Sequence, residues 1–145
     1  MGGKNPCIID QTASITLTAR RIVWGKYVNC GQTCIAPDYL LVHQSKVSEL
    51  SQALILEIKK AFGKDPLKSS SYGKIISQKH LLHLKKMLEG ESIIYGGNMN
   101  EEELYLEPTL IDQPDLDSEI MKDEIFGPLL PILSYENEEE LKPII

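Results

Sequence analysis

Short apolar runs alternate with helical patterns of apolar residues in the first half of the chain. Residues 6–10 form an apolar run typical of a buried strand, and turn and capping residues follow it. Apolar residues then recur at helical spacing over residues 15–27. Residues 39–43 form a second apolar run, and a second helical pattern extends from Ser45 to Gly63. This half therefore predicts the order strand, helix, strand, helix.

The second half of the chain predicts a helix between two polar segments. Residues 64–72 contain Pro66 and three serines, which indicates a surface loop. Ser77 is expected to cap a helix that ends near Gly90. Residues 96–103 are a second polar segment and are expected to form a turn. The apolar face of the helix is expected to consist of Leu81, Leu84 and Leu88.

Three further extended segments are predicted around these polar regions. Residues 92–95 and 129–135 are apolar runs typical of strands. Residues 104–112 form a longer extended run with Pro108 at its centre, and a proline there argues for an edge strand or an irregular one. Residues 138–141 are expected to begin a last helix.

The alternation of strands and helices favours an α/β fold, with a mostly parallel sheet flanked by helices. A length of 145 residues is sufficient for one hydrophobic core, and 42% hydrophobic and 25% charged residues are ordinary for a soluble protein. No internal repeat, low-complexity tract or long linker divides the sequence. We therefore expect a single domain over residues 1–145.

Charge and cysteine content narrow the classes of protein to consider. The net charge of −6 and the isoelectric point near 5.1 oppose binding to nucleic acid, which requires clustered Lys and Arg. No apolar run approaches the ~20 residues of a membrane helix, and the N-terminus lacks the pattern of a signal peptide. Three cysteines, Cys7, Cys30 and Cys34, argue against a disulfide framework. A cytoplasmic protein with free thiols is therefore expected.

Both ends of the chain look like cuts within a larger protein. Met1 leads almost directly into the first apolar run, and residues 142–145 lie in an apolar stretch. Natural domain ends are usually polar and exposed. We therefore expect a domain truncated at both ends, and a very small natural homologue is the alternative.

The segment with the clearest chemical potential is residues 29–37, Asn-Cys-Gly-Gln-Thr-Cys-Ile-Ala-Pro. A glycine after a helix permits a sharp turn, and the free amides of the following loop can stabilise a thiolate and bind a developing oxyanion. Cys34 is therefore a candidate nucleophile. Residue types alone leave the opposite interpretation open, because most free cysteines are buried as small hydrophobic residues.

Three motifs resemble those of the aldehyde dehydrogenase superfamily and occur in the same order. Residues 29–34 resemble the family motif Asn-x-Gly-Gln-x-Cys, and Glu-Ile-Phe-Gly-Pro at residues 124–128 is similar to a second family signature. Gly-Gly-Lys-Asn-Pro at residues 2–6 resembles the end of a third, Glu-Leu-Gly-Gly-Lys-Ser-Pro. Residues 24–27 and 35–39 are most similar to the class 3 and fatty aldehyde dehydrogenase branch. The resemblance extends over essentially the whole chain and implies the family's catalytic domain.

This resemblance implies a reaction and the residues that carry it. Cys34 occupies the position of the nucleophile, which attacks the aldehyde, forms a thiohemiacetal and then carries a thioester. Its backbone amide matches one oxyanion donor. Glu124 matches the glutamate that binds the nicotinamide ribose, and Phe126 matches a phenylalanine near the nicotinamide ring. The implied cofactor is NAD or NADP, the substrate is an aldehyde, and the full-length enzyme is a homo-oligomer.

Several parts of the family's machinery are absent from the chain. The general base is the glutamate that opens the third motif, and Met1 stands one residue after that position. The second oxyanion donor, an asparagine, and the cofactor-binding domain belong to family sequence upstream of this chain. Loss of one oxyanion donor costs roughly 10²-fold or more in rate. We therefore expect little or no dehydrogenase activity from the chain alone.

Metal binding is not expected. Cys30 and Cys34 lack the second cysteine pair or histidine cluster that completes a zinc site. His80 and His83 lie three residues apart on the predicted helix, but no carboxylate or cysteine accompanies them. Such histidines are more often solvated surface residues.

Two other functions remain open from the sequence. A cysteine hydrolase or acyltransferase would use Cys34 without a nicotinamide cofactor, although no His or Asp signature accompanies this cysteine. A non-catalytic interaction module would use none of the motifs. Residues 124–128 favour the dehydrogenase over the hydrolase, because that motif has a role only beside a cofactor ribose.

Overall fold

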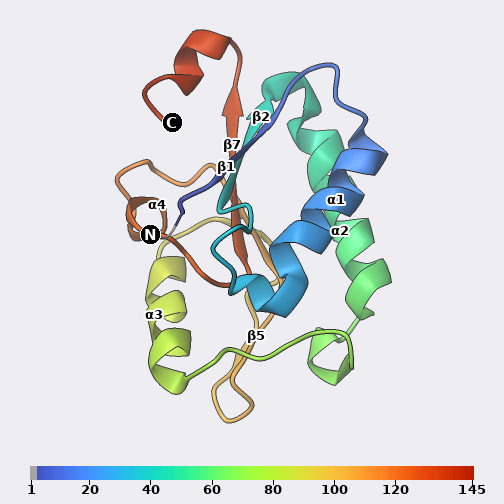
Figure 1. The fold of residues 1–145 in the computed structure, drawn as a ribbon, viewed down its shortest axis with the longest axis vertical. Helices are drawn as coiled ribbons and strands as arrows, with labels where there is room; N and C mark the ends of the chain where they lie inside the picture. Colours follow the sequence, from blue (N-terminus) through green and yellow to red (C-terminus); the bar gives the residue numbers. More distant parts are fainter. Residues whose placement is uncertain (1–2) are drawn as a thin grey trace.

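A five-stranded sheet lies at the centre of residues 3–145, the part of the chain that this computed structural model describes (Figure 1). Four strands run parallel and the fifth, at one edge, is antiparallel to its neighbour. The predicted fold class, a mostly parallel α/β sheet, is therefore confirmed. In their order across the sheet the strands are β1 (Pro6–Ile9), β2 (Tyr39–His43), β7 (Leu129–Tyr135), β6 (Thr109–Asp112) and β3 (Ile93–Tyr95).

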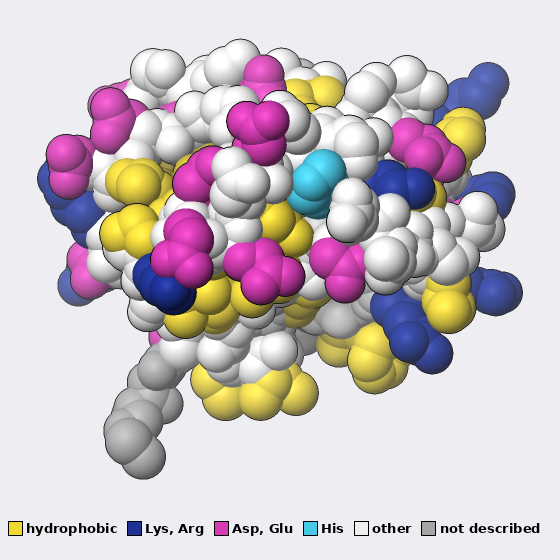
Figure 2. Space-filling view, turned by 90° about the horizontal axis from the view of Figure 1, so that it is seen from above, with side chains coloured by type: hydrophobic (Ala, Val, Ile, Leu, Met, Phe, Trp, Pro, Cys, Tyr) yellow, Lys and Arg dark blue, Asp and Glu magenta, His cyan; other side chains and the backbone are white. Residues whose placement is uncertain are grey.

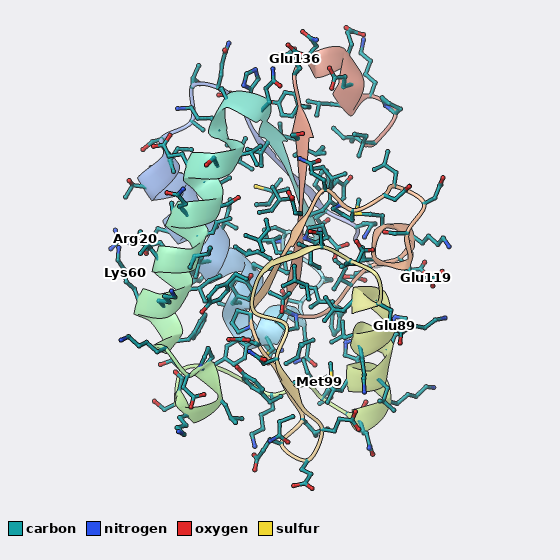
Figure 3. The ribbon with its side chains drawn as sticks, turned by 180° about the vertical axis from the view of Figure 1, so that it is seen from behind. Arg20, Lys60, Glu89, Met99, Glu119 and Glu136 are labelled. Carbon is teal, nitrogen blue, oxygen red and sulfur yellow. The ribbon has the colours of Figure 1, made fainter. Side chains whose placement is uncertain are left out.

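Helices flank the sheet on both sides (Figure 1). On one side α1 (Ile15–Tyr27) packs against α2 (Val47–Phe62), and on the other α3 (Gln78–Leu88) lies beside α4 (Glu119–Lys122). Figure 3 shows Arg20 and Lys60 on the outer side of the first helical layer and Glu119 on the outer side of the second. The charged residues therefore point away from the sheet, as expected for amphipathic helices.

The core fills the space between the sheet and the helices. Leu40 and Leu41 of β2 and Ile132 of β7 are fully buried, because helices cover both faces of these strands. In α2 the buried positions recur at helical spacing, and Gly63 ends the helix with a φ of 78°. The strands and helices predicted for the first half of the chain are confirmed within a few residues. The first strand is not buried as predicted, however, because β1 lies at the edge of the sheet and Ile8 is 48% exposed.

The prediction for residues 104–112 is partly wrong. Pro108 lies in a break between β5 (Tyr105–Leu106) and β6. The run is therefore irregular, which was one of the two predicted alternatives. However, β6 is not an edge strand, because it lies between β7 and β3. The proline does not disrupt the sheet because it precedes the paired residues of β6.

Smaller elements also differ from the prediction. The polar segment 96–103 contains β4 (Met99–Asn100), which pairs with β5 as a separate two-stranded sheet. Helix α4 was not expected, and residues 138–141 form only a 3₁₀ turn. On α3 the three buried positions are Leu81, Leu84 and Met87, so Met87 takes the place expected for Leu88. Ser77 caps α3 as predicted, since its side chain accepts a hydrogen bond from the His80 amide at 3.2 Å.

The surface agrees with the acidic composition. Figure 2 shows many Asp and Glu side chains on the face seen from above, with most of the Lys and Arg near its margins. Within residues 3–145, no helix is both long and apolar enough to cross a membrane.

Candidate active site

The segments that carry the three motifs lie at the amino-terminal ends of neighbouring parallel strands. Residues 3–5 precede β1, residues 30–38 precede β2 and residues 123–128 precede β7. Because β1 pairs with β2 and β2 pairs with β7, all in parallel, the three segments meet at the amino-terminal end of these strands. The fold thus joins residues that are far apart in sequence, such as Lys4 and Ile120, whose positions differ by 116.

The cysteine loop begins with a sharp turn after α1. Asn29, Cys30 and Gly31 all have positive φ values, of 52°, 57° and 73°. Asparagine and glycine tolerate this left-handed conformation better than other residues. The three residues reverse the chain direction at the end of the helix and lead into the segment that carries Cys34.

Gly31 brings the cysteine loop into direct contact with the second motif. A Cβ atom on Gly31 would lie 2.2 Å from the carbonyl oxygen of Gly127 and 3.1 Å from that of Lys26. Only glycine permits two backbones to approach so closely. The two signatures recognised separately in the sequence, around Cys34 and around Glu124, are therefore packed against each other.

Gln32 connects the cysteine loop to the segment before α3. Its side chain is buried, and Nε2 donates to the carbonyl oxygens of Asn29 and Lys74, both at 3.0 Å. Its Oε1 accepts a hydrogen bond from the Ile76 amide at 2.9 Å. The Asn29 side chain donates to the Gln32 carbonyl at 3.2 Å. The side chains of Asn29 and Gln32 therefore hold the loop that carries Cys34.

The three thiols differ in accessibility. Cys34 is exposed, Cys7 is half-buried and Cys30 is fully buried. Burial raises the pKa of Cys7 and raises that of Cys30 to about 11, because a thiolate is poorly solvated inside the protein. Cys34 is thus the thiol that a reagent or a substrate can reach.

Iodoacetamide is expected to modify Cys34 before Cys7, and Cys30 last of all. The thiolate is the reacting form, and burial disfavours it at the other two positions. Mass mapping after brief labelling at neutral pH measures the order, and labelling of the urea-unfolded chain, where the three rates should converge, is the control. Faster modification of Cys30 in the folded chain would contradict the assignment of Cys34 as the reactive thiol.

Lys4 and Asp38 form an ion pair that holds the segment before β7. Lys4 Nζ lies 2.6 Å from Asp38 Oδ2 and donates to the carbonyl oxygens of Ile120 at 2.9 Å and Asp123 at 2.8 Å. Asp38 Oδ1 accepts a hydrogen bond from the Ile125 amide at 3.0 Å. The Asp38 side chain is only 4% exposed, so this pair is shielded from solvent.

Glu124 places an unpaired acceptor in this charged cluster. Its Oε1 atom is buried and has no hydrogen-bond partner within the described residues. Lys26 is nearby and fully buried, and the cost of desolvating its charge lowers its pKa to about 8, although the charges of Asp38 and Glu124 oppose this shift. A buried carboxylate oxygen without a partner is unfavourable, so this atom is a candidate acceptor for a ligand.

Phe126 is held in an unusual backbone conformation. Its φ is 50°, and its carbonyl oxygen accepts a hydrogen bond from His80 Nε2 at 2.7 Å. The His80 and Phe126 rings meet edge to face, with centroids 6.2 Å apart. The Phe126 side chain is 37% exposed, so its ring is available to pack against a ligand. His80 is therefore a partner of the second motif, contrary to the expectation of a solvated surface histidine.

Residues 1–145 match the sequence profile of the aldehyde dehydrogenase family. The chain belongs to this family. Aldehyde dehydrogenase family 3 comG of Dictyostelium discoideum is 48% identical over 140 residues, which are 97% of this chain and 30% of that protein. The 4,4'-diaponeurosporen-aldehyde dehydrogenase of Staphylococcus aureus is 46% identical over 142 residues, which are 97% of this chain and 31% of that protein.

Solved structures of aldehyde dehydrogenases agree with the fold. The substrate-bound state of Staphylococcus aureus AldH matches with a TM-score of 0.97 and 44% identity, over 100% of this chain and 32% of that chain. The NAD-dependent aldehyde dehydrogenase of Sinorhizobium meliloti matches with a TM-score of 0.86 and 32% identity, over 99% of this chain and 30% of that chain. The chain thus spans about a third of the length of these relatives, and the predicted family and class 3 branch are confirmed.

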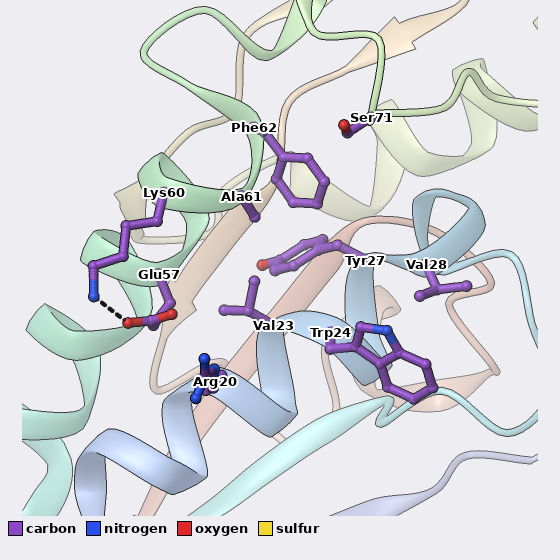
Figure 4. A pocket seen from close by; sticks show the side chains of 10 residues that line it. All are labelled: Arg20, Val23, Trp24, Tyr27, Val28, Glu57, Lys60, Ala61, Phe62 and Ser71. Carbon is purple, nitrogen blue, oxygen red and sulfur yellow. Dashed lines mark hydrogen bonds and ion pairs between the residues drawn. The ribbon is translucent and has the colours of Figure 1, made fainter.

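An apolar hollow adjoins the aldehyde dehydrogenase cysteine motif. Trp24, which is 75% exposed, and Ile35, which is 86% exposed, line it together with Pro37. Trp24 also borders a second hollow of about 500 Å³ between α1 and α2, where Figure 4 shows Tyr27 and Phe62 beside it. Two large exposed apolar side chains that line one hollow make it a candidate surface for contact with a ligand or another part of a protein.

The structure brings together most of what the motifs predicted and adds residues that they did not. The Cys34 loop and the segment of Glu124 and Phe126 are in backbone contact, through the glycines described above. Within the described residues, no group of three or more His, Cys, Asp and Glu side chains is arranged for a metal ion. The roles of Lys4, Asn5, Lys26, Asp38 and His80 were missed. Lys4, Asn5, Lys26 and Asp38 lie within or beside the quoted motifs, but membership of a motif does not indicate the distant contacts that these residues make.

Proposed function

We propose that this chain is the nucleophile-bearing part of an NAD(P)-dependent aldehyde dehydrogenase that oxidises aldehydes to carboxylates. The observation that carries the proposal is the contact of Gly31 with Gly127, which packs the loop of the exposed Cys34 against the segment of Glu124. An oxidation of this kind needs a nucleophile and a hydride acceptor side by side.

In the proposed reaction Cys34 performs the covalent steps. Its thiolate attacks the carbonyl carbon of the aldehyde, and the carbonyl oxygen becomes the oxyanion of a thiohemiacetal. The backbone amide of Cys34 is the proposed donor to that oxyanion. Loss of hydride from the former aldehyde carbon leaves a thioester on Cys34, and water then releases the carboxylic acid and the free thiol.

The residues of the second motif fit a nicotinamide cofactor, which supplies the hydride acceptor when bound. The buried, unpaired Oε1 of Glu124 can accept a hydrogen bond from a ribose hydroxyl. Phe126 offers a partly exposed ring, and the His80 hydrogen bond to its carbonyl keeps that ring in position. The choice between NAD and NADP belongs to regions of the relatives outside this chain.

The hollow beside the cysteine loop supports an apolar aldehyde as substrate. Its lining at Trp24, Ile35 and Pro37 offers hydrocarbon and aromatic surface, and Arg20 and Arg21 also line it. Ile35 directly follows Cys34 in the sequence. Apolar walls favour an alkyl or aryl group over a sugar or a charged group. The name of the Staphylococcus aureus relative, a 4,4'-diaponeurosporen-aldehyde dehydrogenase, is in line with this proposal.

The remainder of the enzyme is proposed to supply what the chain lacks. The relatives are about three times as long. Their additional length is the proposed source of the cofactor-binding domain, the general base and the second oxyanion donor, and of the contacts of a homo-oligomer. On this proposal the chain alone reduces no NAD or NADP when aldehydes are added.

A chimera tests the proposed function directly. Residues 1–145 replace the matching segment of Staphylococcus aureus AldH, whose fold they share with a TM-score of 0.97. We expect aldehyde-dependent reduction of NAD or NADP that Cys34→Ala removes. A folded chimera without that reduction would refute the proposal. Release of nitrophenol from an activated ester, without any aldehyde oxidation, would instead favour the cysteine hydrolase.

In this chimera Glu124→Gln is expected to slow hydride transfer by about 10²-fold. Gln keeps the shape of the side chain but weakens its acceptor for the ribose hydroxyls, and a displacement of about 1 Å costs roughly that factor. Single-turnover formation of NADH measures the hydride step, and acylation of Cys34 by a nitrophenyl ester is the control that should be spared. An unchanged hydride rate together with a lowered Tm would assign Glu124 to the scaffold.

A further inference from the structure

Lys4 and Asn5 are consecutive residues whose side chains bind two different segments of the site. Lys4 has one neighbouring carboxylate and two carbonyl acceptors, at 2.6–2.9 Å, which together use the three donors of its ammonium group. Two of these acceptors, Ile120 and Asp123, belong to the stretch that leads into Glu124. The third, Asp38, in turn accepts from the amide of Ile125. Lys4 therefore binds the residues before Glu124 directly, and it contacts Ile125, the residue after Glu124, indirectly through Asp38.

Asn5 binds the other segment, the loop of Cys34. Its Nδ2 donates to the carbonyl oxygen of Cys34 at 2.7 Å and to that of Ala36 at 3.1 Å. Because a peptide group is planar, fixing the Cys34 carbonyl also fixes the direction of the following amide. The Asn5 carbonyl oxygen accepts from the Asp38 amide at 2.9 Å, which joins the two sets of contacts.

Gly3 keeps the Asn5 side chain in this position. A Cβ atom on residue 3 would lie 2.4 Å from Asn5 Oδ1, so any larger residue there must displace the Asn5 amide group. The sequence Gly-Lys-Asn at residues 3–5 thus forms a compact unit with one residue for each task.

We propose that Lys4 and Asn5 are positioning residues, of which Lys4 holds the Glu124 segment and Asn5 holds the Cys34 loop. Neither side chain acts on the substrate. Because Lys4 and Asn5 are joined by one peptide bond, directly before β1, they hold the two segments in a fixed relation to each other. The relevance of this arrangement to catalysis rests on the proposed function. The claim that the two residues hold the two segments in place does not depend on that function.

Amide hydrogen exchange in the folded 145-residue chain separates the two tasks. The reporters are the Ala36 amide, bonded to the Thr33 carbonyl at 3.2 Å, and the Ile125 amide, bonded to Asp38 at 3.0 Å. Asn5→Asp removes both donors at constant size, and we expect roughly tenfold faster exchange at Ala36 with less than twofold change at Ile125. Lys4→Met should give the reverse pattern.

Matched variants distinguish positioning from general stability. Asn5→Ser retains one donor and should give an intermediate rate at Ala36, and Lys4→Arg retains the charge and should restore most of the protection at Ile125. Gly3→Ala should reproduce the effect of Asn5→Asp, although it leaves Asn5 itself unchanged. The amides of Leu41 and Leu133, in the paired strands β2 and β7, report global opening.

Two results would overturn the inference. The first is an unchanged exchange rate at Ala36 in Asn5→Asp and at Ile125 in Lys4→Met. It would show that the contacts of Asn5 and Lys4 do not restrict the motion of these two segments. An equal rise at both reporters and in β2 and β7 would show that the two residues stabilise the fold only as a whole. If the reversed patterns appear but the chimera oxidises no aldehyde, the positioning roles stand and the proposed function fails.

Discussion

Gly31→Ala is expected to lower the free energy of unfolding by about 4 kcal/mol, a large part of the total stability of a domain of this size. Two costs combine. A side chain at a φ of 73° costs roughly 1–3 kcal/mol, and the new Cβ would lie 2.2 Å from the Gly127 carbonyl oxygen, so one of the two backbones must move. Urea unfolding followed by circular dichroism measures the change.

Gly90→Ala is the matched control for this substitution. Gly90 also has a positive φ, of 82°, but no atom lies within 4 Å of a Cβ placed there. It therefore reports the cost of the backbone conformation alone, of the order of 1 kcal/mol. If both variants lose the same free energy of unfolding, the close approach of Gly31 to Gly127 does not contribute to stability. The contact between the two motifs would then have no measurable energetic effect.

Lys26→Met is expected to raise the free energy of unfolding by about 3 kcal/mol at pH 7. Lys26 is fully buried and its pKa is about 8 in the folded chain, below its ordinary 10.5. The unfolded chain therefore binds the proton more tightly, so the wild type loses stability as pH falls from 10.5 towards 8 and carries the full penalty below 8. Lys4, Asp38 and Glu124 are the charged groups that act on it.

The advantage of Lys26→Met should accordingly vanish as the pH rises. The difference in unfolding free energy between the variant and the wild type is measured from pH 7 to pH 10.5, and Lys79→Met, at an exposed position, is the control without pH dependence. A difference that stays constant with pH would contradict the lowered pKa and assign the gain to packing alone. A charge retained at such a cost is in keeping with a role near Glu124.

The fold was predictable where the elements are long and periodic. The helices α1 and α2 and the strand β2 follow from hydrophobic spacing alone, because each has several buried positions at regular spacing. Elements of two to four residues, such as β4, β5 and α4, have too few positions for a period. The place of β6 within the sheet was wrong because the neighbours of a strand are set by tertiary contacts, which a proline outside the strand does not reveal.

The site was predictable only as far as its motifs resemble those of a known family. Cys34 is the exposed thiol, as a nucleophile must be, and Glu124 carries the unpaired buried oxygen that a cofactor residue would have. Their assignments remain predictions. The contacts of Lys4, Asn5 and His80 act between residues 29 to 119 positions apart, so no local pattern could indicate them.

The position of β7 has a consequence for biosynthesis. The ribosome makes β7 after both β2 and β6, yet β7 lies between them and joins them into one sheet. Until residues 129–135 have emerged, β2 and β6 each expose an unpaired edge, a surface prone to aggregation. The segment with Glu124 directly precedes β7, so its contact with the Cys34 loop also requires residues that are made after β2. A nascent chain therefore depends on protection of those edges until residues 129–135 are available.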